Sequence, residues 1–392
     1  MLDRMLLPCI LLITFFTTYV FICRMMAYDT DVSAHTVYAN EFLDGAIKNS
    51  YPGYYLIFGF LSRVCGMPQI YAAASAVGLF SVMTGIAVYV ISGCVLGWNG
   101  SERIRCLIVL FMLYFGPLYL GGDSYYLGPG SFNSWHNPTN SGVKFLALIC
   151  FYLFMYVFHM EEHQTVSVFG KQLGRKQLNG ILMILVVCSL VFKPSFFQVF
   201  APFLAVVFVL DFLTRRRPFK EYFLDALIYV PGVLVILYQI FAELTPEQSG
   251  GGIFISFAMG WGFHTDNIFR AIMANAIFPL FVCVFCEKNL FKNKALLYSM
   301  LFYVVSLGEA LLLVESGPRM YHGNFLWGME LGIGIGFMGA ILCFVQYCQS
   351  IKENATLKQR AVCYVGNGLL AAHFILGVWY ILSCIIMELE YF

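Results

Sequence analysis

The sequence predicts an all-α polytopic membrane protein, from its composition, the lengths of its apolar segments and the distribution of its basic residues. Of the 392 residues, 60% are hydrophobic and only 11% are charged, whereas a soluble domain carries about 25% charged residues. The net charge of +1 gives no electrostatic basis for binding nucleic acid. We therefore expect membrane lipids to surround most of the chain, and no nucleic acid among its partners.

A membrane-spanning helix needs about 20 apolar residues, and about eleven segments are candidates for one. The first has no small-x-small cleavage site at its end, so we expect a retained span rather than a signal peptide. Residues 180–213, divided at Lys193-Pro194-Ser195, form either a tight hairpin or two full crossings. No repeat or linker divides residues 1–392, which predicts a single transmembrane domain. The candidate spans are 5–25, 70–97, 106–120, 141–160, 180–193, 195–213, 222–244, 268–286, 295–314, 326–347 and 363–387.

The loops between these spans differ in composition on the two sides of the membrane. With the N-terminus in the cytoplasm, most of the 23 Lys and Arg residues fall in short cytoplasmic loops, as the positive-inside rule requires. Both N-glycosylation acceptor sequences, Asn99-Gly100-Ser101 and Asn354-Ala355-Thr356, fall on that same side, which favours a bacterial plasma membrane. The extracytoplasmic loops concentrate Gly, Pro, Trp, His, Asn, Asp and Tyr, so we expect the active site there. They are residues 26–69, 121–140, 245–267 and 315–325.

The first extracytoplasmic loop carries the strongest functional signal. Asp29, Asp31 and His35 follow directly after the first span. Charged groups are costly beside hydrocarbon and are usually retained there for chemistry or ion handling. Asp31 and His35 are four positions apart and therefore share one helix face. These three residues are the candidate catalytic residues, although Thr30 or Asp31 would also serve as a helix N-cap.

Two helices at the membrane surface are expected within this loop, at residues 30–48 and 54–65. Apolar residues recur at helical spacing in the first segment. The second is too short to span a bilayer. A break at Tyr51-Pro52-Gly53 separates them.

This order of features resembles the C-type glycosyltransferase superfamily (GT-C), membrane enzymes that use polyprenyl-phosphate-linked sugars. The resemblance covers residues 1–100, and Asp31-Val-Ser-Ala-His35 is similar to the Asp-x-x-x-His pattern of bacterial members. Beyond that region the chain matches only in the number and topology of its spans. The resemblance implies inverting transfer from a lipid-linked sugar donor to a glycan, lipid or wall-polymer acceptor. It places the catalytic acid of the family at Asp31, with Asp29 completing an Asp-x-Asp.

The residues leave two roles open for this pair of carboxylates. A positioned carboxylate can take the proton of the attacking hydroxyl group. An Asp-x-Asp pair can instead hold Mg²⁺ or Mn²⁺ against the donor phosphate. The sequence does not distinguish the base from the metal ligand, or Asp29 from Asp31 as the residue that does the main work.

Candidate substrate-binding residues lie in the second extracytoplasmic loop and at the break between two spans. Trp135, His136 and Asn137 suit a sugar, with an aromatic face beneath the ring and polar groups for its hydroxyls. Alternatively, Trp135 belongs to the interfacial aromatic belt and Asn137 starts a helix. Lys193 is either a phosphate ligand or a solvated lysine at a hairpin tip.

The third and fourth extracytoplasmic loops supply the remaining candidates. His264 follows a glycine-rich stretch that could admit a bulky acceptor. Glu315, Arg319, His322 and Asn324 crowd one turn, and an arginine suits bidentate phosphate recognition. Alternatively, Glu315 and Arg319 form an ion pair that braces the loop.

Two other classes of membrane protein remain open. A transporter or flippase places charged residues deep in its spans, where Glu309 and Glu330 are the acidic candidates. A polysaccharide polymerase or ligase also has many spans. Cys283 and Cys286 are three positions apart in an apolar segment, and we interpret them as small helix-packing residues rather than as ligands or disulfide partners.

Overall fold

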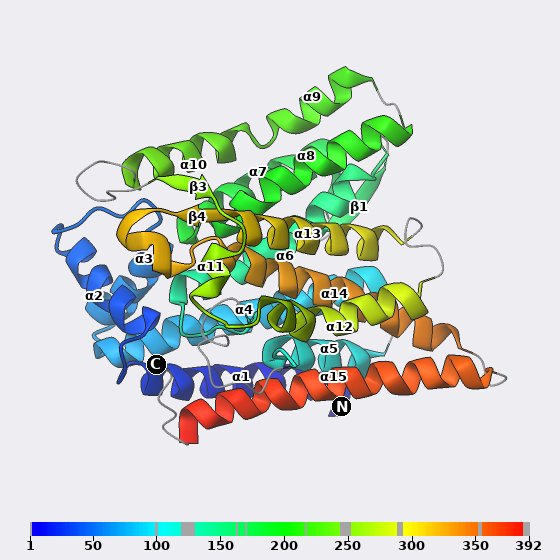
Figure 1. Ribbon diagram of the computed structural model, residues 1–392, viewed down its shortest axis with the longest axis horizontal. Coiled ribbons are helices and arrows are strands. Elements are labelled where there is room, and N and C mark those ends of the chain that lie inside the picture. Colours follow the sequence, from blue (N-terminus) through cyan, green and yellow to red (C-terminus); the bar gives the residue numbers. More distant parts are fainter. Residues whose placement is uncertain are drawn as a thin grey trace.

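The computed structural model describes residues 2–98, 101–118, 130–161, 164–168, 171–215, 218–243, 252–287, 293–351 and 355–386. In this part of the chain, nine helices are long and apolar enough to cross a membrane, and a bent pair would make ten. These helices lie side by side (Figure 1). The long apolar helices confirm the predicted class, an all-α membrane-embedded protein.

The nine long helices correspond to segments expected from the sequence. Residues 180–213 contain two of them, separated at Lys193-Pro194, and each is long enough to cross a bilayer. The helices are α1 (Leu2–Met25), α4 (Gln69–Leu96), α6 (Pro138–Phe158), α7 (Arg175–Phe192), α8 (Ser195–Arg215), α12 (Ile268–Phe285), α13 (Lys294–Leu312), α14 (Leu326–Ser350) and α15 (Leu357–Ile386).

Two expected spans have a different form. Residues 222–244 are covered by α9 (Phe219–Leu227) and α10 (Val230–Glu243), which meet at an angle of 53°. The expected span at 106–120 is only partly helical, because α5 (Glu102–Tyr114) ends before Gly116-Pro117. A proline disfavours the helical conformation of the residue before it. The backbone N–H of Gly116 instead donates to the carbonyl oxygen of His373 in α15, at 3.0 Å.

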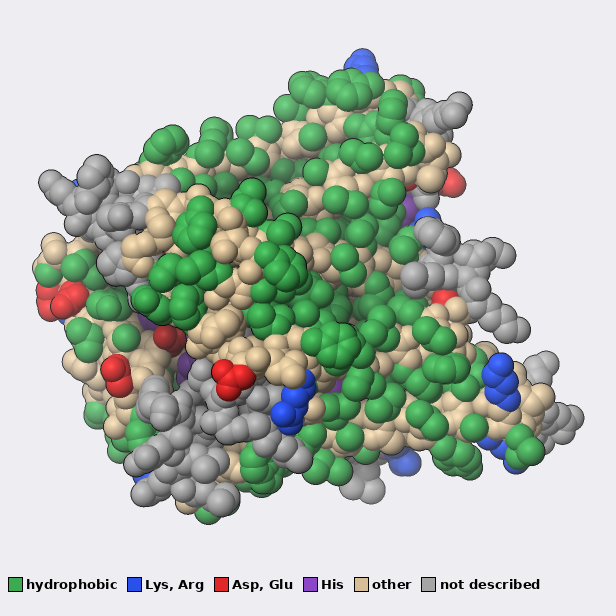
Figure 2. Space-filling model, in the orientation of Figure 1, with side chains coloured by type: hydrophobic (Ala, Val, Ile, Leu, Met, Phe, Trp, Pro, Cys, Tyr) green, Lys and Arg blue, Asp and Glu red, His purple; other side chains and the backbone are tan. Residues whose placement is uncertain are grey.

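The helix bundle has two distinct ends. One carries α2 (Asp31–Leu43) and α3 (Gly53–Gly59), and we call it the α2 end (Figure 1). Toward the opposite end lies an antiparallel hairpin of β1 (Thr165–Val168) and β2 (Lys171–Gly174). Figure 2 shows that hydrophobic side chains cover much of the flank between the two ends, as contact with lipid requires.

The two short helices expected in the first loop are present at the α2 end. Thr30 is the N-cap of α2, and its backbone N–H donates to Ser33 Oγ at 3.0 Å. The helix ends at Leu43 rather than near residue 48, because Gly45 adopts a left-handed conformation with φ of 74°. After α3 the chain continues as a π-helix, Phe60–Val64.

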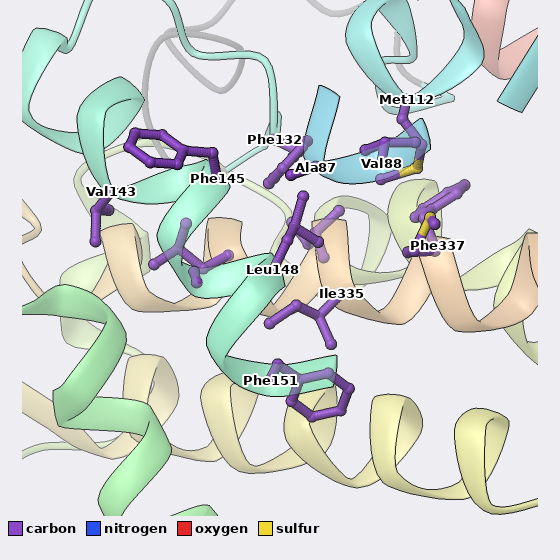
Figure 3. Close-up of a cluster of buried hydrophobic side chains, with 14 of the residues drawn as sticks. Ala87, Val88, Met112, Phe132, Val143, Phe145, Leu148, Phe151, Ile335 and Phe337 are labelled. Carbon is purple, nitrogen blue, oxygen red and sulfur yellow. The ribbon is translucent and has the colours of Figure 1, made fainter. Parts of the chain in front are cut away.

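The core is built around α6 and α14, the two most buried of the long helices. Figure 3 shows Leu148 and Phe151 of α6 beside Ile335 of α14. Glycines along α14 permit this packing, since a Cβ at Gly332 or Gly339 would overlap serines of α13. Small residues allow helices within a membrane to approach closely.

Replacement of Gly377 by alanine is expected to destabilise the protein by about 1–3 kcal/mol. A Cβ at this position in α15 would overlap backbone atoms of Tyr114 and Gly116, which cannot rotate away. The measurement is thermal unfolding in detergent. The matched control is Gly368→Ala in the same helix, where no described atom lies within 4 Å of the added carbon. Equal melting temperatures for the two variants would contradict the prediction.

Candidate active site

The candidate site forms where the N-termini of α2 and α6 meet. Asp31 is the first residue of α2, and its side chain is partly exposed. Asn137 Nδ2 donates a hydrogen bond of 2.7 Å to Asp31 Oδ2. Asn137 is also the N-cap of α6, because its Oδ1 accepts the backbone N–H of Asn140 at 2.9 Å. The contact thus fixes the carboxylate against a buried helix start.

A buried cation adjoins this pair. Lys193 lies at the corner between α7 and α8 and is 9% exposed. Its Nζ donates to Asn137 Oδ1 at 3.3 Å and lies 4.3 Å from the centre of the Trp327 ring. Burial lowers the pKa of Lys193 to about 8, although the carboxylates of Asp31 and Glu330 oppose that shift. The alternative of a fully solvated lysine at a hairpin tip is therefore wrong.

His35 is the second predicted catalytic residue beside Asp31. Its Nδ1 is 3.1 Å from the hydroxyl oxygen of Tyr55 in α3. Burial lowers the pKa of His35 to about 4, against the attraction of Asp31. The imidazole is therefore neutral at pH 7, and the Tyr55 hydroxyl fixes its orientation.

The environment keeps Asp31 ionised. Burial by itself would raise the pKa of this carboxyl group, but the interactions with His136 and with the ammonium of Lys193, together with the hydrogen bond from Asn137, outweigh burial and lower it. An ionised, partly exposed carboxylate can accept a proton from a ligand. The adjoining lysine can stabilise a negative charge that develops on that ligand.

A second polar cluster lies beneath the first, inside the bundle. Glu330 of α14 is fully buried, and its Oε2 accepts hydrogen bonds from Ser134 Oγ and from Asn140 Nδ2, the latter at 2.9 Å. Lys144 Nζ lies 3.5 Å from Ser134 Oγ. Ser195 Oγ donates to Asn140 Oδ1 at 3.3 Å. The cluster connects α6, α8 and α14 directly below Asn137.

Sequence reasoning did not place Ser134, Asn140 and Glu330 in the site. A signal was present for Glu330, because an ionisable residue inside an apolar span is a functional candidate by default. Ser134 and Asn140 are ordinary residues of a loop and a helix start, and only the tertiary structure gives them partners.

The prediction that Trp135 forms part of a sugar-binding surface is wrong. It is 2% exposed, and its ring packs edge-on against Phe21 and Tyr114 at 5.6 and 5.8 Å. The adjacent His136 is also buried, with its ring 6.0 Å from that of Trp327 and close enough to Asp31 to influence its charge. Trp135 therefore belongs to the hydrophobic core, whereas His136 lies beside the carboxylate.

Asp29 lies apart from this cluster. Its side chain is exposed and makes no hydrogen bond or ion pair with the described part of the chain. Among the described residues, no group of three His, Cys, Asp or Glu side chains is arranged to hold a metal ion. A metal role for Asp29 and Asp31 therefore stays a prediction.

The third and fourth extracytoplasmic loops join each other through a two-stranded sheet that the sequence did not predict. Strand β3 (Ile253–Ile255) pairs antiparallel with β4 (Leu313–Glu315). His264 interacts with the charge of Asp31, and burial lowers the pKa of His264. Its Nε2 lies against Gly323. One side of the candidate site is therefore formed by residues from both loops.

The structure describes the remaining candidates of the fourth loop only in part. Glu315 Oε2 accepts a hydrogen bond from Asn324 Nδ2. The backbone of Arg319 and His322 forms a 3₁₀ helix (Gly317–His322), but their side chains lie outside the described residues. Their predicted contacts with phosphate stay predictions.

Comparison with known proteins provides no relative for this chain. No protein-family model, curated protein or solved structure matches it. A functional interpretation must therefore come from the site itself.

Proposed function

We propose that this protein is a membrane glycosyltransferase of the GT-C type. It would transfer a sugar from a polyprenyl-phosphate or polyprenyl-diphosphate donor to a glycan, lipid or wall-polymer acceptor. The observation that supports this most is the hydrogen-bonded series Asp31, Asn137 and Lys193, which sets a base beside a buried cation. A lipid-linked sugar needs both groups at the membrane surface.

The proposed step is a single displacement. Asp31 accepts the proton of the acceptor hydroxyl group while that oxygen attacks the anomeric carbon. The bond between the anomeric carbon and the phosphate oxygen breaks, and the phosphate takes the electron pair. Attack from the face opposite the leaving group inverts the anomeric configuration. His136, Asn137 and His264 lie near Asp31 and are the candidates to bind the sugar.

The leaving phosphate needs positive charge. Lys193 makes one hydrogen bond with the described residues, at 3.3 Å, and Lys144 makes one at 3.5 Å. An ammonium group has three donors, so both lysines keep donors for an anionic ligand. Arg319 and His322 are further candidates to bind phosphate.

The orientation is part of the same proposal. Basic residues at the end opposite α2 include Lys171 in β2, Arg175 and Lys176 in α7, and Lys294 in α13. By the positive-inside rule this end faces the cytoplasm. The N-terminus would then be cytoplasmic and the candidate site extracytoplasmic, in a bacterial plasma membrane.

The buried Glu330 cluster also favours a second candidate function, transport or flipping. Ionisable residues inside spans often mark an ion or substrate pathway, and Glu330 interacts there with both Lys144 and Lys193. The two functions differ in their dependence on Asp31. Flipping of a labelled polyprenyl-phosphate sugar that survives Asp31→Asn would support the transporter.

The function is tested by turnover with a panel of donors. The full-length protein in membranes is supplied with polyprenyl-phosphate and polyprenyl-diphosphate sugars that carry a labelled sugar, together with membrane lipids and glycans as acceptors. We expect release of polyprenyl phosphate or diphosphate together with a labelled product. Turnover of no donor in the panel would contradict the proposal.

Donor binding is expected to weaken as the pH rises through about 8, the pKa of Lys193 in the free protein. Only the protonated ammonium attracts phosphate, so the affinity falls by up to about tenfold for each pH unit above that value. The measurement is the dissociation constant of a polyprenyl phosphate at several pH values. Lys193→Arg should move this loss to higher pH, because an arginine stays charged, and Lys48→Arg is the surface control. An unchanged pH profile in Lys193→Arg would contradict the assignment.

A further inference from the structure

We infer that Cys348 and Cys363 form a reversible disulfide when the protein meets a hydroperoxide. Cys348 lies near the end of α14 and Cys363 near the start of α15. Their sulfur atoms are 2.9 Å apart. A disulfide bond is ~2.05 Å long, so the two atoms need to approach by only about 0.9 Å. This inference does not depend on the proposed function.

The surrounding packing holds the two cysteines together. One turn further along, a Cβ at Gly366 of α15 would overlap the ring of Phe344 in α14, so the helices are in close contact there. Only 15 residues separate the cysteines along the chain. Both side chains are half-buried. The pair is thus held in place and still partly accessible to a small oxidant.

The reaction balances with the peroxide as the oxidant. One thiolate attacks a peroxide oxygen, the O–O bond breaks, and a sulfenic acid and one water form. The thiol of the second cysteine attacks the sulfenic sulfur, the S–O bond breaks, and a second water leaves. Two thiols have then lost two electrons and two protons to one hydrogen peroxide. A small dithiol reverses the bond by exchange.

In a cell the state of the pair depends on its compartment. In the proposed orientation, the turn between α14 and α15 faces the cytoplasm, where thiols are kept reduced. The resting form would then be the dithiol, and the disulfide would appear on exposure to peroxide. The disulfide would join α15 to the far end of α14, the helix that carries Trp327 and Glu330. A change in redox state would therefore act on a helix of the candidate site.

The test is mass spectrometry of the full-length protein in detergent. The reduced protein is treated with hydrogen peroxide, free thiols are alkylated, and peptides are analysed with and without dithiothreitol. We expect loss of most alkylation at Cys348 and Cys363 and a linked peptide lighter by two hydrogen atoms, which dithiothreitol separates. Exposed Cys65, at the α2 end, is the internal reference for general oxidation.

Variants distinguish this pair from its neighbours. Cys286 lies close enough to Cys348 to interact with it electrostatically, so it is the competing partner. Cys286→Ser should leave the linked peptide in place, and Cys363→Ser should remove it. Oxidation should raise the melting temperature of the wild type and leave that of Cys363→Ser unchanged. A bond from Cys348 to Cys286, or full alkylation of both cysteines after Cys65 has been oxidised, would overturn the inference.

Discussion

Replacement of Asp31 by asparagine is expected to lower sugar transfer by a factor on the order of 10²–10⁴ while the protein still folds. The amide has the shape of the carboxylate, and its oxygen can still accept the hydrogen bond from Asn137 that fixes the site. The amide cannot take a proton from the acceptor hydroxyl group. The measurement is release of labelled product at saturating donor, with melting temperature and donor affinity determined on the same samples.

The matched control is Asp29→Asn. Asp29 is two residues away on the same segment, exposed and outside the hydrogen-bonded cluster. We expect this variant to keep most of its activity. The pair of variants also decides which of the two carboxylates is the base, a question that the sequence left open. Full activity in Asp31→Asn would remove the assigned base, and loss of activity in Asp29→Asn alone would transfer the role to Asp29.

The spans were predictable because the bilayer sets their length. Nine of the eleven expected spans are long helices in the described part of the chain. One of the two exceptions is instructive, because residues 106–120 form an apolar segment and yet α5 ends at Tyr114. A count of apolar residues does not register that Pro117 ends the helix or that the N–H of Gly116 finds a partner in α15.

The candidate site was predictable in its residues but not in its contacts. Asp31, Asn137 and Lys193 were each noticeable as polar residues beside apolar spans, yet 106 and 56 positions separate the hydrogen-bonded pairs. Their convergence depends on helix packing that a single sequence does not reveal. For the same reason Trp135 resembled a surface aromatic, although its ring fills space between Phe21 and Tyr114.

Removal of the Glu330 carboxylate is expected to cause the largest loss of stability, about 3–5 kcal/mol for Glu330→Ala. Glu330 is fully buried and accepts hydrogen bonds from Ser134 and Asn140. Its charge also faces Lys144, which is 3% exposed. Without the carboxylate, a buried ammonium and two buried polar groups lose a partner. The measurement is denaturant unfolding in detergent micelles.

Two further variants show whether the loss comes from the broken cluster. Glu309→Ala removes a carboxylate from the neighbouring helix α13, where its Oε2 has no hydrogen-bond partner among the described residues, so it should cost less. Removing both charges with Glu330→Gln and Lys144→Met should cost less than the sum of the single changes, by about 0.5–3 kcal/mol. Strict additivity would mean that the two charges do not interact.

The same cluster connects stability to activity. Ser134 and Asn140 flank Asn137, the residue that holds Asp31 and Lys193. If Glu330 positions that loop, Glu330→Gln should lower turnover even under conditions where the variant is fully folded, because Asn137 shifts relative to the base. A variant that is destabilised but turns over normally when folded would show that Glu330 supports only the bundle, and that the loop holds Asn137 without it.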